Sequence, residues 1–431
     1  MSKVDKNPYK GARDFYPEDM RTQQWMFDKW RRVCERYGYQ AYDAPILERT
    51  ELYLMKGSQE IVDEQTYTFE DRGGRSVTIR TEMTPTVSRM VAARRQELSY
   101  PARWYSIPNL WRYERMQRGR LREFWQLNVD MFGVDSTRAE MEMIQIADDL
   151  FQVFKAKRSS YTIKINSRVL VNTVMQQAGL SGDESINVVR LIDKIHKLPT
   201  EEFAAQLDTH TGDKEISKNI IDFLASTPID DIDLSLHGLS SVKTLQSVLK
   251  QCKALGITNV VFDPSLMRGF DYYTDFVFEA FDNDPDNNRS MFGGGRYDGL
   301  VGQFGVEPVP TVGFAVGDVT FMNFLETHKL LPNIRSSVQV TVIPRDAKYM
   351  DDAMRVTQEL REIGVNTSVD FTGRKFQKLL KSAEKSDVRF VLIVGENEVE
   401  SEQYTLKDLK NGKEQKHSIA RIASIVLDHR N

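Results

Sequence analysis

Residues 111–133 limit the possible folds of this chain most sharply, and they read W-R-Y-E-R-M-Q-R-G-R-L-R-E-F-W-Q-L-N-V-D-M-F-G. The pattern predicts a strand, a loop and a second strand. Eleven consecutive positions carry five arginines, namely Arg112, Arg115, Arg118, Arg120 and Arg122. Guanidinium groups suit phosphates because they are planar, permanently charged and bidentate. The hairpin is therefore interpreted either as a polyphosphate platform or as a charged surface hairpin held by salt bridges.

The second strand has two chemically different faces, because successive side chains of a strand alternate. One face carries Leu121, Glu123, Trp125, Leu127, Val129 and Met131. The opposite face carries Arg122, Phe124, Gln126, Asn128 and Asp130. The first face, apart from Glu123, fits a hydrophobic core. The second face would place polar groups in mid-sheet, which is costly unless each is paired or meets a ligand.

Composition excludes several classes of protein. The 431 residues suggest more than one domain. With 58 basic and 62 acidic residues the net charge is −4, so any contact with nucleic acid must come from local patches. The polar first residues and the lack of long apolar runs predict no signal peptide and no membrane span. Cys34 and Cys252 are far apart, which argues against a disulfide framework and against a metal site. We expect a cytoplasmic protein.

Periodicity predicts a mixed α/β fold. Helical spacing predicts a helix over 18–37, followed by a strand that carries Pro45 and must therefore lie at an edge or a bulge. A hairpin is predicted over 66–80. Thr84 is expected to cap the next helix, with Pro85 at its first position.

The later part of the chain changes character twice. Residues 168–256 are mostly helical and suggest a helical insertion. Strand patterns return at 258–316. Residues 337–431 alternate between strand and helix patterns, which favours a compact α/β domain.

The string R-G-F-D-Y-Y at 268–273 is a second chemical signal. Arg268 on a tight turn could place one positive charge at a reacting centre. Tyr272 and Tyr273 could form aromatic walls with polar tips. A hairpin whose tyrosines only pack in the core is the alternative.

Two weaker signals remain. R-T-E-M-T-P at 80–85 places Glu82 between a strand and a helix, where its carboxylate could bind an ammonium group or interact with the helix N-terminus. The run G-G-G-R-Y-D-G at 293–299 lacks the G-K-S/T ending of a phosphate loop. It is interpreted as a glycine hairpin by default, with close backbone approach to a ligand as the alternative.

Together these segments resemble the histidyl-tRNA synthetase family of class II aminoacyl-tRNA synthetases. Y-G-Y-Q-A-Y-D-A-P-I-L at 37–47 resembles class II motif 1, and R-Y-E at 112–114 with R-L-R-E-F at 120–124 resembles motif 2. R-G-F-D-Y-Y and G-G-G-R-Y-D are similar to the two signatures of the histidine enzyme. Residues 337–431 resemble the anticodon-binding domain that the histidine, threonine, proline and glycine enzymes share.

The resemblance implies an α/β (α+β) fold with a class II antiparallel β-sheet flanked by helices. It implies a catalytic domain made of residues 1–167 and 257–330, a helical insertion at 168–256 and an anticodon-binding domain at 337–431. The implied activity is ATP-dependent activation of L-histidine to histidyl-adenylate and its transfer to the 3′ end of histidine tRNA. ATP is then a substrate accompanied by Mg²⁺, and motif 1 implies a homodimer.

The family's site residues map onto matching positions of this sequence. Arg112 would hold the α-phosphate, and Arg268 would lie beside the α-phosphate and the substrate carboxylate. Glu114 would face adenine, Phe124 would stack on it and Arg120 would reach the terminal phosphates. The implied histidine pocket consists of Glu82, Thr84, Arg112, Gln126, Asp130, Arg268, Tyr272 and Tyr273. No nucleophilic side chain is needed, because positioning and electrostatic stabilisation carry such a reaction.

Two basic patches are expected to contact tRNA. The motif 2 loop offers Arg115, Gln117 and Arg118 near the acceptor end. A helix expected to begin at Arg374 places Arg374, Lys378, Lys381 and Lys385 on one face. A basic face that is merely solvated is the alternative for this helix.

Three positions depart from the family pattern. Val319 and Thr320 stand where motif 3 of the family usually has Glu and Arg. Met116 stands where the motif 2 loop commonly has proline. Asp130 stands where the family usually has glutamate, and it offers a shorter side chain for binding the substrate ammonium. The missing arginine favours the alternative of a non-catalytic, synthetase-like regulator or tRNA sensor. The retained arginines and tyrosines favour the enzyme. A class II enzyme for threonine, proline or glycine is disfavoured by R-G-F-D-Y-Y.

Overall fold

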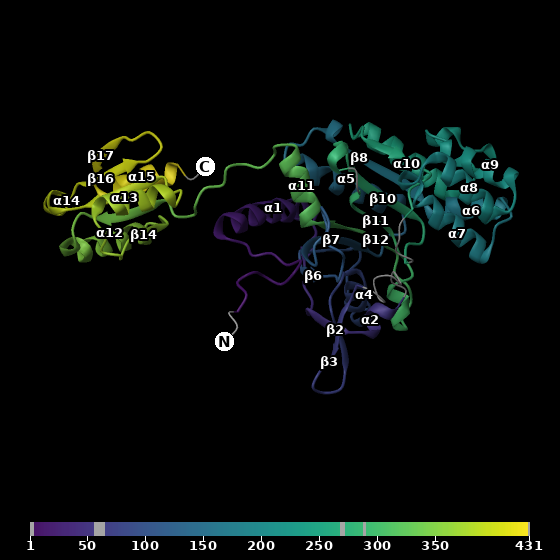
Figure 1. The fold of residues 1–431 in the computed structure, drawn as a ribbon, viewed down its shortest axis with the longest axis horizontal. Helices are drawn as coiled ribbons and strands as arrows, with labels where there is room; N and C mark the ends of the chain where they lie inside the picture. Colours follow the sequence, from purple (N-terminus) through teal and green to yellow (C-terminus); the bar gives the residue numbers. More distant parts are fainter. Residues whose placement is uncertain (1–3, 56–64, 268–271, 288–289, 430–431) are drawn as a thin grey trace. The chain divides into compact units, whose positions relative to one another are not determined.

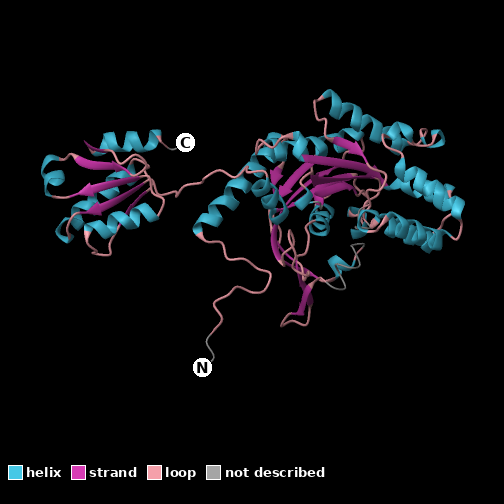
Figure 2. Ribbon diagram, turned by 45° about the horizontal axis from the view of Figure 1, so that its top comes forward, coloured by secondary structure: helices cyan, strands magenta, loops and turns pink. Residues whose placement is uncertain are grey.

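The structure of this chain is a computed structural model. It describes residues 4–55, 65–267, 272–287 and 290–429. The chain divides into two compact units, a larger one that holds Gln23–Leu331 and a smaller one that holds Pro332–Asn431. Each unit contains its own sheet flanked by helices, as Figures 1 and 2 show. The predicted mixed α/β fold is confirmed.

A nine-stranded sheet forms the centre of the larger unit, counted over the residues that the structure describes. Its order is β1-β5-β7-β12-β11-β10-β8-β9, and β6 pairs with β7. The strands are β1 (Gln40–Ala41), β5 (Ala102–Ser106), β6 (Asn109–Trp111), β7 (Glu123–Phe132), β8 (Tyr161–Ser167), β9 (Val260–Phe262), β10 (Phe276–Asp282), β11 (Ser290–Arg296) and β12 (Thr311–Gly317). The pairs are antiparallel except β1–β5 and β8–β9, so the predicted antiparallel character is confirmed.

The main core lies under one face of this sheet. It is covered by α1 (Pro17–Arg36), α5 (Thr137–Gln152) and α11 (Asp318–Thr327). Leu127, Val129 and Met131 of β7 are buried there, as the alternation predicts. Trp30 of α1 packs edge-on against Phe321 of α11, with ring centroids 5.4 Å apart. Each such side chain contributes about 1.5–3 kcal/mol when it leaves water.

Helices also fill the segment between β8 and β9. They are α6 (Arg168–Gln177), α7 (Gly182–Ile192), α8 (Thr200–Thr211), α9 (Lys214–Ala225) and α10 (Ser240–Ala254). Figure 1 shows α6, α7, α8 and α9 gathered beside the sheet. The helix α9 begins where the Asp213 side chain accepts hydrogen bonds from the backbone N–H groups of Glu215 and Ile216.

A small sheet of order β2-β4-β3 lies beside motif 1. Its strands are β2 (Leu47–Arg49), β3 (Tyr67–Glu70) and β4 (Ser76–Ile79), and the short helix α2 (Glu51–Leu54) follows β2. The prediction of one continuous strand through Pro45 is wrong. Pro45 lies between β1 and β2, outside any strand, because it cannot donate a hydrogen bond to a sheet.

The helix α4 (Thr84–Ala93) starts one residue earlier than predicted. Met83 occupies the N-cap position, and Thr84 is the first helical residue. The prediction that Thr84 caps this helix is therefore wrong. Its side chain lines the cavity described below instead.

The smaller unit has a five-stranded sheet of order β14-β13-β15-β16-β17. Its strands are β13 (Val340–Pro344), β14 (Thr367–Val369), β15 (Phe390–Val394), β16 (Tyr404–Asp408) and β17 (Glu414–His417), and its helices are α12 (Met350–Glu362), α13 (Phe376–Lys385), α14 (Glu396–Ser401) and α15 (Ile419–Asp428). All five residues of β15 are buried, as expected for a strand covered on both faces. In the part of the chain that the structure describes, no helix is long and apolar enough to cross a membrane.

The helix α13 begins two residues later than predicted. Arg374 lies in the preceding loop, where its Nε donates to Thr372 Oγ1 at 2.8 Å and its Nη2 pairs with Asp370 Oδ2 at 3.4 Å. Lys378 and Lys381 lie on the exposed side of the helix, and Leu379 and Ala383 face the core. The amphipathic prediction holds for the helix itself but not for Arg374.

Candidate active site

A cavity of about 1070 Å³ opens over the polar face of the large sheet. Its volume is at the upper end for small-molecule sites. The predicted site residues among its lining are Glu82, Thr84, Arg112, Glu114, Gln117, Arg118, Arg120, Phe124, Gln126, Asp130, Tyr272 and Tyr273. Arg115 and Arg122 are not among the lining residues, and Arg268 lies outside the described residues.

Two arginines share one carboxylate at the mouth of this cavity. Glu114 Oε1 lies 3.8 Å from Arg112 Nη1, and its Oε2 lies 3.2 Å from Arg120 Nη1. Arg112 is further fixed because its Nε donates to the carbonyl of Thr81 at 3.0 Å. Its guanidinium lies over the Phe124 ring, 5.5 Å from the centroid. A planar cation and an aromatic ring are thus held next to each other on the cavity wall.

Glu82 is a buried carboxylate at the inner end of the cavity, with 5% of its surface exposed. It accepts a hydrogen bond from the Tyr272 hydroxyl at 3.3 Å. Burial raises its pKa, while the charge of Arg112 and the tyrosine bond act in the opposite direction. A cationic ligand would stabilise the ionised form.

Asp130 is the second buried carboxylate. The Tyr297 hydroxyl donates to its Oδ1, whereas Oδ2 is buried and has no hydrogen-bond partner among the residues that the structure describes. Burial raises the pKa of Asp130 to about 7, against the effect of the tyrosine bond. An unpartnered buried carboxylate oxygen is costly, so it marks a place where a ligand N–H group would be favourable. Tyr297 was not among the predicted site residues, although it stands in the G-G-G-R-Y-D string that signals it.

A family model described as Histidyl-tRNA synthetase matches residues 11–318, well over half of this chain. The chain belongs to the histidyl-tRNA synthetase family. A second family model, described as Anticodon binding domain, matches residues 339–429. The resemblance inferred from the motifs is confirmed.

Relatives of this family match nearly the full chain. The histidine–tRNA ligase of Leptospira biflexa is 41% identical over 411 residues, covering 94% of both chains. That of Thermococcus kodakarensis is 34% identical over 439 residues, covering 99% of both chains. The histidyl-tRNA synthetase from Nostoc sp. PCC 7120 has a TM-score of 0.85 at 24% identity, covering 99% of this chain and 100% of that chain. An ATP phosphoribosyltransferase regulatory subunit/histidyl-tRNA synthetase from Bacillus halodurans C has a TM-score of 0.74 at 21% identity, covering 91% and 99%. These two structures support the fold alone.

The glycine run of the family's second signature lies in β11, which pairs antiparallel with the preceding strand β10, as the default interpretation of a glycine hairpin predicts. The strands pack so closely here that side chains would collide. A Cβ at Gly294 would lie 2.1 Å from the carbonyl oxygen of Gly313, and a Cβ at Gly313 would lie 2.3 Å from Asp130 Oδ1. Of these two glycines only Gly313 lines the cavity, and it forms a floor there: its missing side chain leaves room for the Asp130–Tyr297 pair.

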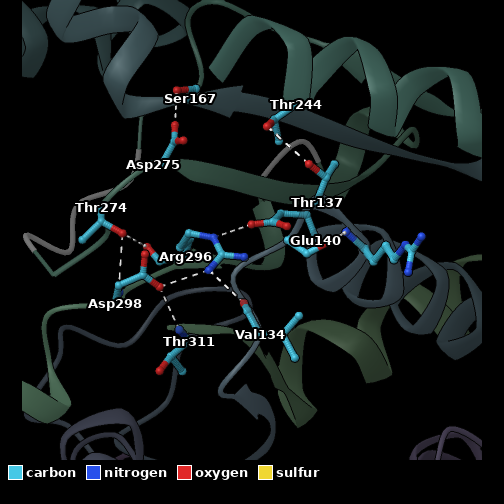
Figure 3. Close-up of polar contacts among 12 residues, drawn as sticks. Val134, Thr137, Glu140, Ser167, Thr244, Thr274, Asp275, Arg296, Asp298 and Thr311 are labelled. Carbon is cyan, nitrogen blue, oxygen red and sulfur yellow. Dashed lines mark hydrogen bonds and ion pairs between the residues drawn. The ribbon is translucent and has the colours of Figure 1, made fainter. Parts of the chain in front are cut away.

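The arginine of the same signature has a structural role that sequence reasoning did not assign. Figure 3 shows Arg296 in a buried network: its Nε donates to Glu140, and its Nη1 donates to the carbonyl of Val134 at 3.2 Å and to Asp298 at 3.1 Å. The backbone N–H of Thr274 donates to the Arg296 carbonyl at 2.7 Å. The network fixes both the strand end before Tyr297 and the segment just after Tyr273. It therefore supports the tyrosine wall without entering the cavity.

The motif 2 loop ends in a tight turn next to the motif 3 helix. Gln117 and Arg120 exchange two backbone hydrogen bonds of 3.2 and 2.9 Å. A Cβ at Gly119 would lie 3.2 Å from Thr320 Cγ2. Thr320, which replaces the usual motif 3 arginine, thus lies against this turn, and its hydroxyl donates to the carbonyl of Met291 at 3.0 Å.

Proposed function

We propose that this protein activates L-histidine with ATP and transfers the histidyl group to the 3′ end of histidine tRNA. The observation that carries the proposal is one cavity that joins arginines near its mouth to two buried carboxylates at its inner end. Such a cavity suits a substrate pair of a polyphosphate and a cationic amino acid. The naming of the relatives as histidine–tRNA ligases supports the same activity.

In this proposal the motif 2 hairpin binds ATP. Arg112 holds the α-phosphate, where the histidine carboxylate attacks and pyrophosphate leaves. Arg120 reaches the terminal phosphates, and Phe124 stacks on adenine with Glu114 at its edge. Two anions must approach each other in this step, so fixed cations lower its barrier. Mg²⁺ enters as part of the ATP substrate.

The inner end of the cavity binds histidine in this proposal. Glu82, Thr84, Gln126 and the two tyrosines of R-G-F-D-Y-Y surround the amino acid, and Asp130 binds its ammonium group. The buried and incompletely paired Asp130 supports this assignment. Arg268 is assigned to the reacting carboxylate and α-phosphate from the family resemblance alone.

Three wider assignments complete the proposal. The motif 2 loop, with Arg115, Gln117 and Arg118, contacts the acceptor end of tRNA. The protein works as a homodimer, in which motif 1 forms the interface. The reaction takes place in the cytoplasm, a reducing compartment that agrees with the buried free thiols of Cys34 and Cys252.

The decisive measurement is ATP–pyrophosphate exchange without tRNA, with histidine, threonine, proline and glycine supplied in turn. We expect exchange with histidine alone, followed by charging of histidine tRNA.

Asp130→Asn should raise the KM for histidine more than the KM for ATP, because it removes the buried charge at the amino-acid end. If the purified protein shows no histidine-dependent exchange, the regulator alternative replaces the enzyme.

A further inference from the structure

Among the described residues, no strand pairs with the outer half of β7 on one of its two sides. On that side β12 pairs only with Gln126–Phe132. On the other side β6 continues the ladder along Glu123–Trp125. Glu123 and Trp125 therefore lie outside the part of β7 that pairs with β12, and β12 does not accept hydrogen bonds from their backbone N–H groups. Unpaired donors of this kind need other acceptors.

Two segments distant in the sequence supply these acceptors. The carbonyl of Gly11 accepts the N–H groups of Arg122 at 3.0 Å and of Glu123 at 3.1 Å. The carboxylate of Asp318, at the start of α11, accepts the N–H of Trp125 at 2.9 Å. The N-terminal arm, defined here as residues 9–15, thus takes the place of a strand beside the motif 2 hairpin.

Arg122 joins the arm to the hairpin through its side chain. Its stem covers Gly11 so closely that a Cβ there would lie 2.7–2.9 Å from Arg122 carbons. Its Nη1 donates to the Tyr9 hydroxyl at 3.2 Å, and its guanidinium lies 3.8 Å from the centroid of the Tyr113 ring. Its backbone carbonyl accepts the N–H of Arg112 at 2.9 Å.

Arg13 makes the second attachment of the arm. Its Nη2 pairs with Asp318 Oδ2 at 2.7 Å, and this carboxylate is 3% exposed. Its guanidinium lies 4.8 Å from the centroid of Phe15, which packs edge-on against Trp125 at 5.3 Å. A buried carboxylate that accepts from both the arm and β7 holds the two together.

We propose that the N-terminal arm is a clasp that positions the nucleotide-binding side of the cavity, with Arg122 and Asp318 as positioning residues. Arg112 bonds directly to Arg122, and Phe124 lies between the two residues whose amides the clasp holds. Without the clasp, Arg112 and Phe124 would have to be ordered when ATP binds, and the free energy that this ordering requires would lower the affinity for ATP. Gln126 and Asp130, in contrast, lie in the part of β7 that pairs with β12. This proposal rests on the proposed function and adds to it.

Gly11→Ala tests the clasp with little change to the core. Gly11 has φ +88°, and the added Cβ would collide with Arg122. We expect the KM for ATP in tRNA-free exchange to rise roughly tenfold, with the KM for histidine within about twofold of wild type, since small misplacements of binding groups have effects of this order. Gly179→Ala is the matched control, because Gly179 has φ +81° but no described atom within 4 Å of the added Cβ.

Arg122→Ala is the second variant, because it removes the contact without adding backbone strain. It should reproduce the ATP defect, and Arg122→Lys should restore part of the affinity through its retained stem and charge. A KM for ATP unchanged in both Gly11→Ala and Arg122→Ala would overturn the clasp. An equal rise in both KM values would overturn it too, because it would indicate general loosening.

The dissociation constant of ATP, measured by tryptophan fluorescence, keeps this test separate from the proposed function. If the wild type binds ATP without exchange, the proposed function fails. The clasp is then supported by weaker ATP binding in Gly11→Ala than in Gly179→Ala, and overturned by equal binding.

Discussion

Asp130 shows how one side chain can couple binding to stability. Its carboxylate is 3% exposed, and one of its oxygens has no hydrogen-bond partner in the described part of the chain. The folded protein therefore carries a group that is poorly solvated until a ligand arrives. A group of this kind lowers the stability of the free protein, and it raises the affinity for a ligand that supplies the missing hydrogen-bond donor.

The pKa of Asp130, raised to about 7 from 3.8, makes a pH-dependent prediction. Between these values the folded state holds the proton more tightly than the unfolded state, so the contribution of Asp130 to stability falls as pH rises through this window. Asp130→Asn cannot ionise. Its Tm relative to wild type should therefore increase from pH 5 to pH 8.

Thermal unfolding at both pH values checks this prediction. Asp135→Asn, at an exposed position, serves as the control and should show a constant difference from wild type. A pH-independent difference for Asp130→Asn would mean that the buried carboxylate is ionised throughout.

At the scale of the elements, alternation and periodicity predicted most of what builds the site. The face of β7 that carries Phe124, Gln126 and Asp130 was predicted from residue order, because a strand has only two faces. By residue order Arg122 belongs to the same face, but in the structure its side chain contacts the N-terminal arm. Residue order could not predict this contact, because a segment far away in the sequence leaves no periodic signal. The close packing around the glycine run could not be predicted for a similar reason, because it depends on which strands are neighbours in the sheet. The domain boundaries and individual site roles stay predictions.

The exposed face of α13 carries the prediction for tRNA binding. Replacing Lys378 and Lys381 with alanine should weaken tRNA binding and flatten its salt dependence, because each lost phosphate contact removes about 0.7–0.9 from the log–log slope. Exchange without tRNA should be unchanged, because the cavity lies in the other unit. Filter binding of histidine tRNA over a salt series measures the slope.

The matched control for α13 replaces Lys410 and Lys413, two exposed lysines in the turn between β16 and β17 of the same unit. This variant should keep the wild-type slope. If the α13 variant also keeps it, the basic face is only solvated, and the contact to tRNA lies elsewhere.

At the scale of the whole molecule, the assembly prediction depends on the surface near motif 1. Ile46 and Leu54 are 55% and 61% exposed, although apolar. We expect light scattering to give twice the chain mass of 49.7 kDa. Ile46→Glu should shift the protein towards the monomer, because a charge would be buried at the interface.

Light scattering of Val261→Glu provides the comparison, since Val261 is also an exposed apolar residue but lies on β9 at the opposite edge of the sheet. That variant should remain a dimer. A wild-type mass of one chain at working concentration would contradict the prediction.

The glycine floor also limits how this cavity can change under selection. No residue is smaller than glycine, so every substitution at Gly313 removes space from the cavity and none creates it. Mutation of the floor can therefore narrow the range of accepted amino acids but cannot widen it. A descendant with a larger substrate would have to change other lining residues, such as Glu82 and Tyr272, which can be replaced by smaller side chains. Substitution at the floor can only reduce the cavity volume, so any increase in volume must come from the larger side chains that line the cavity.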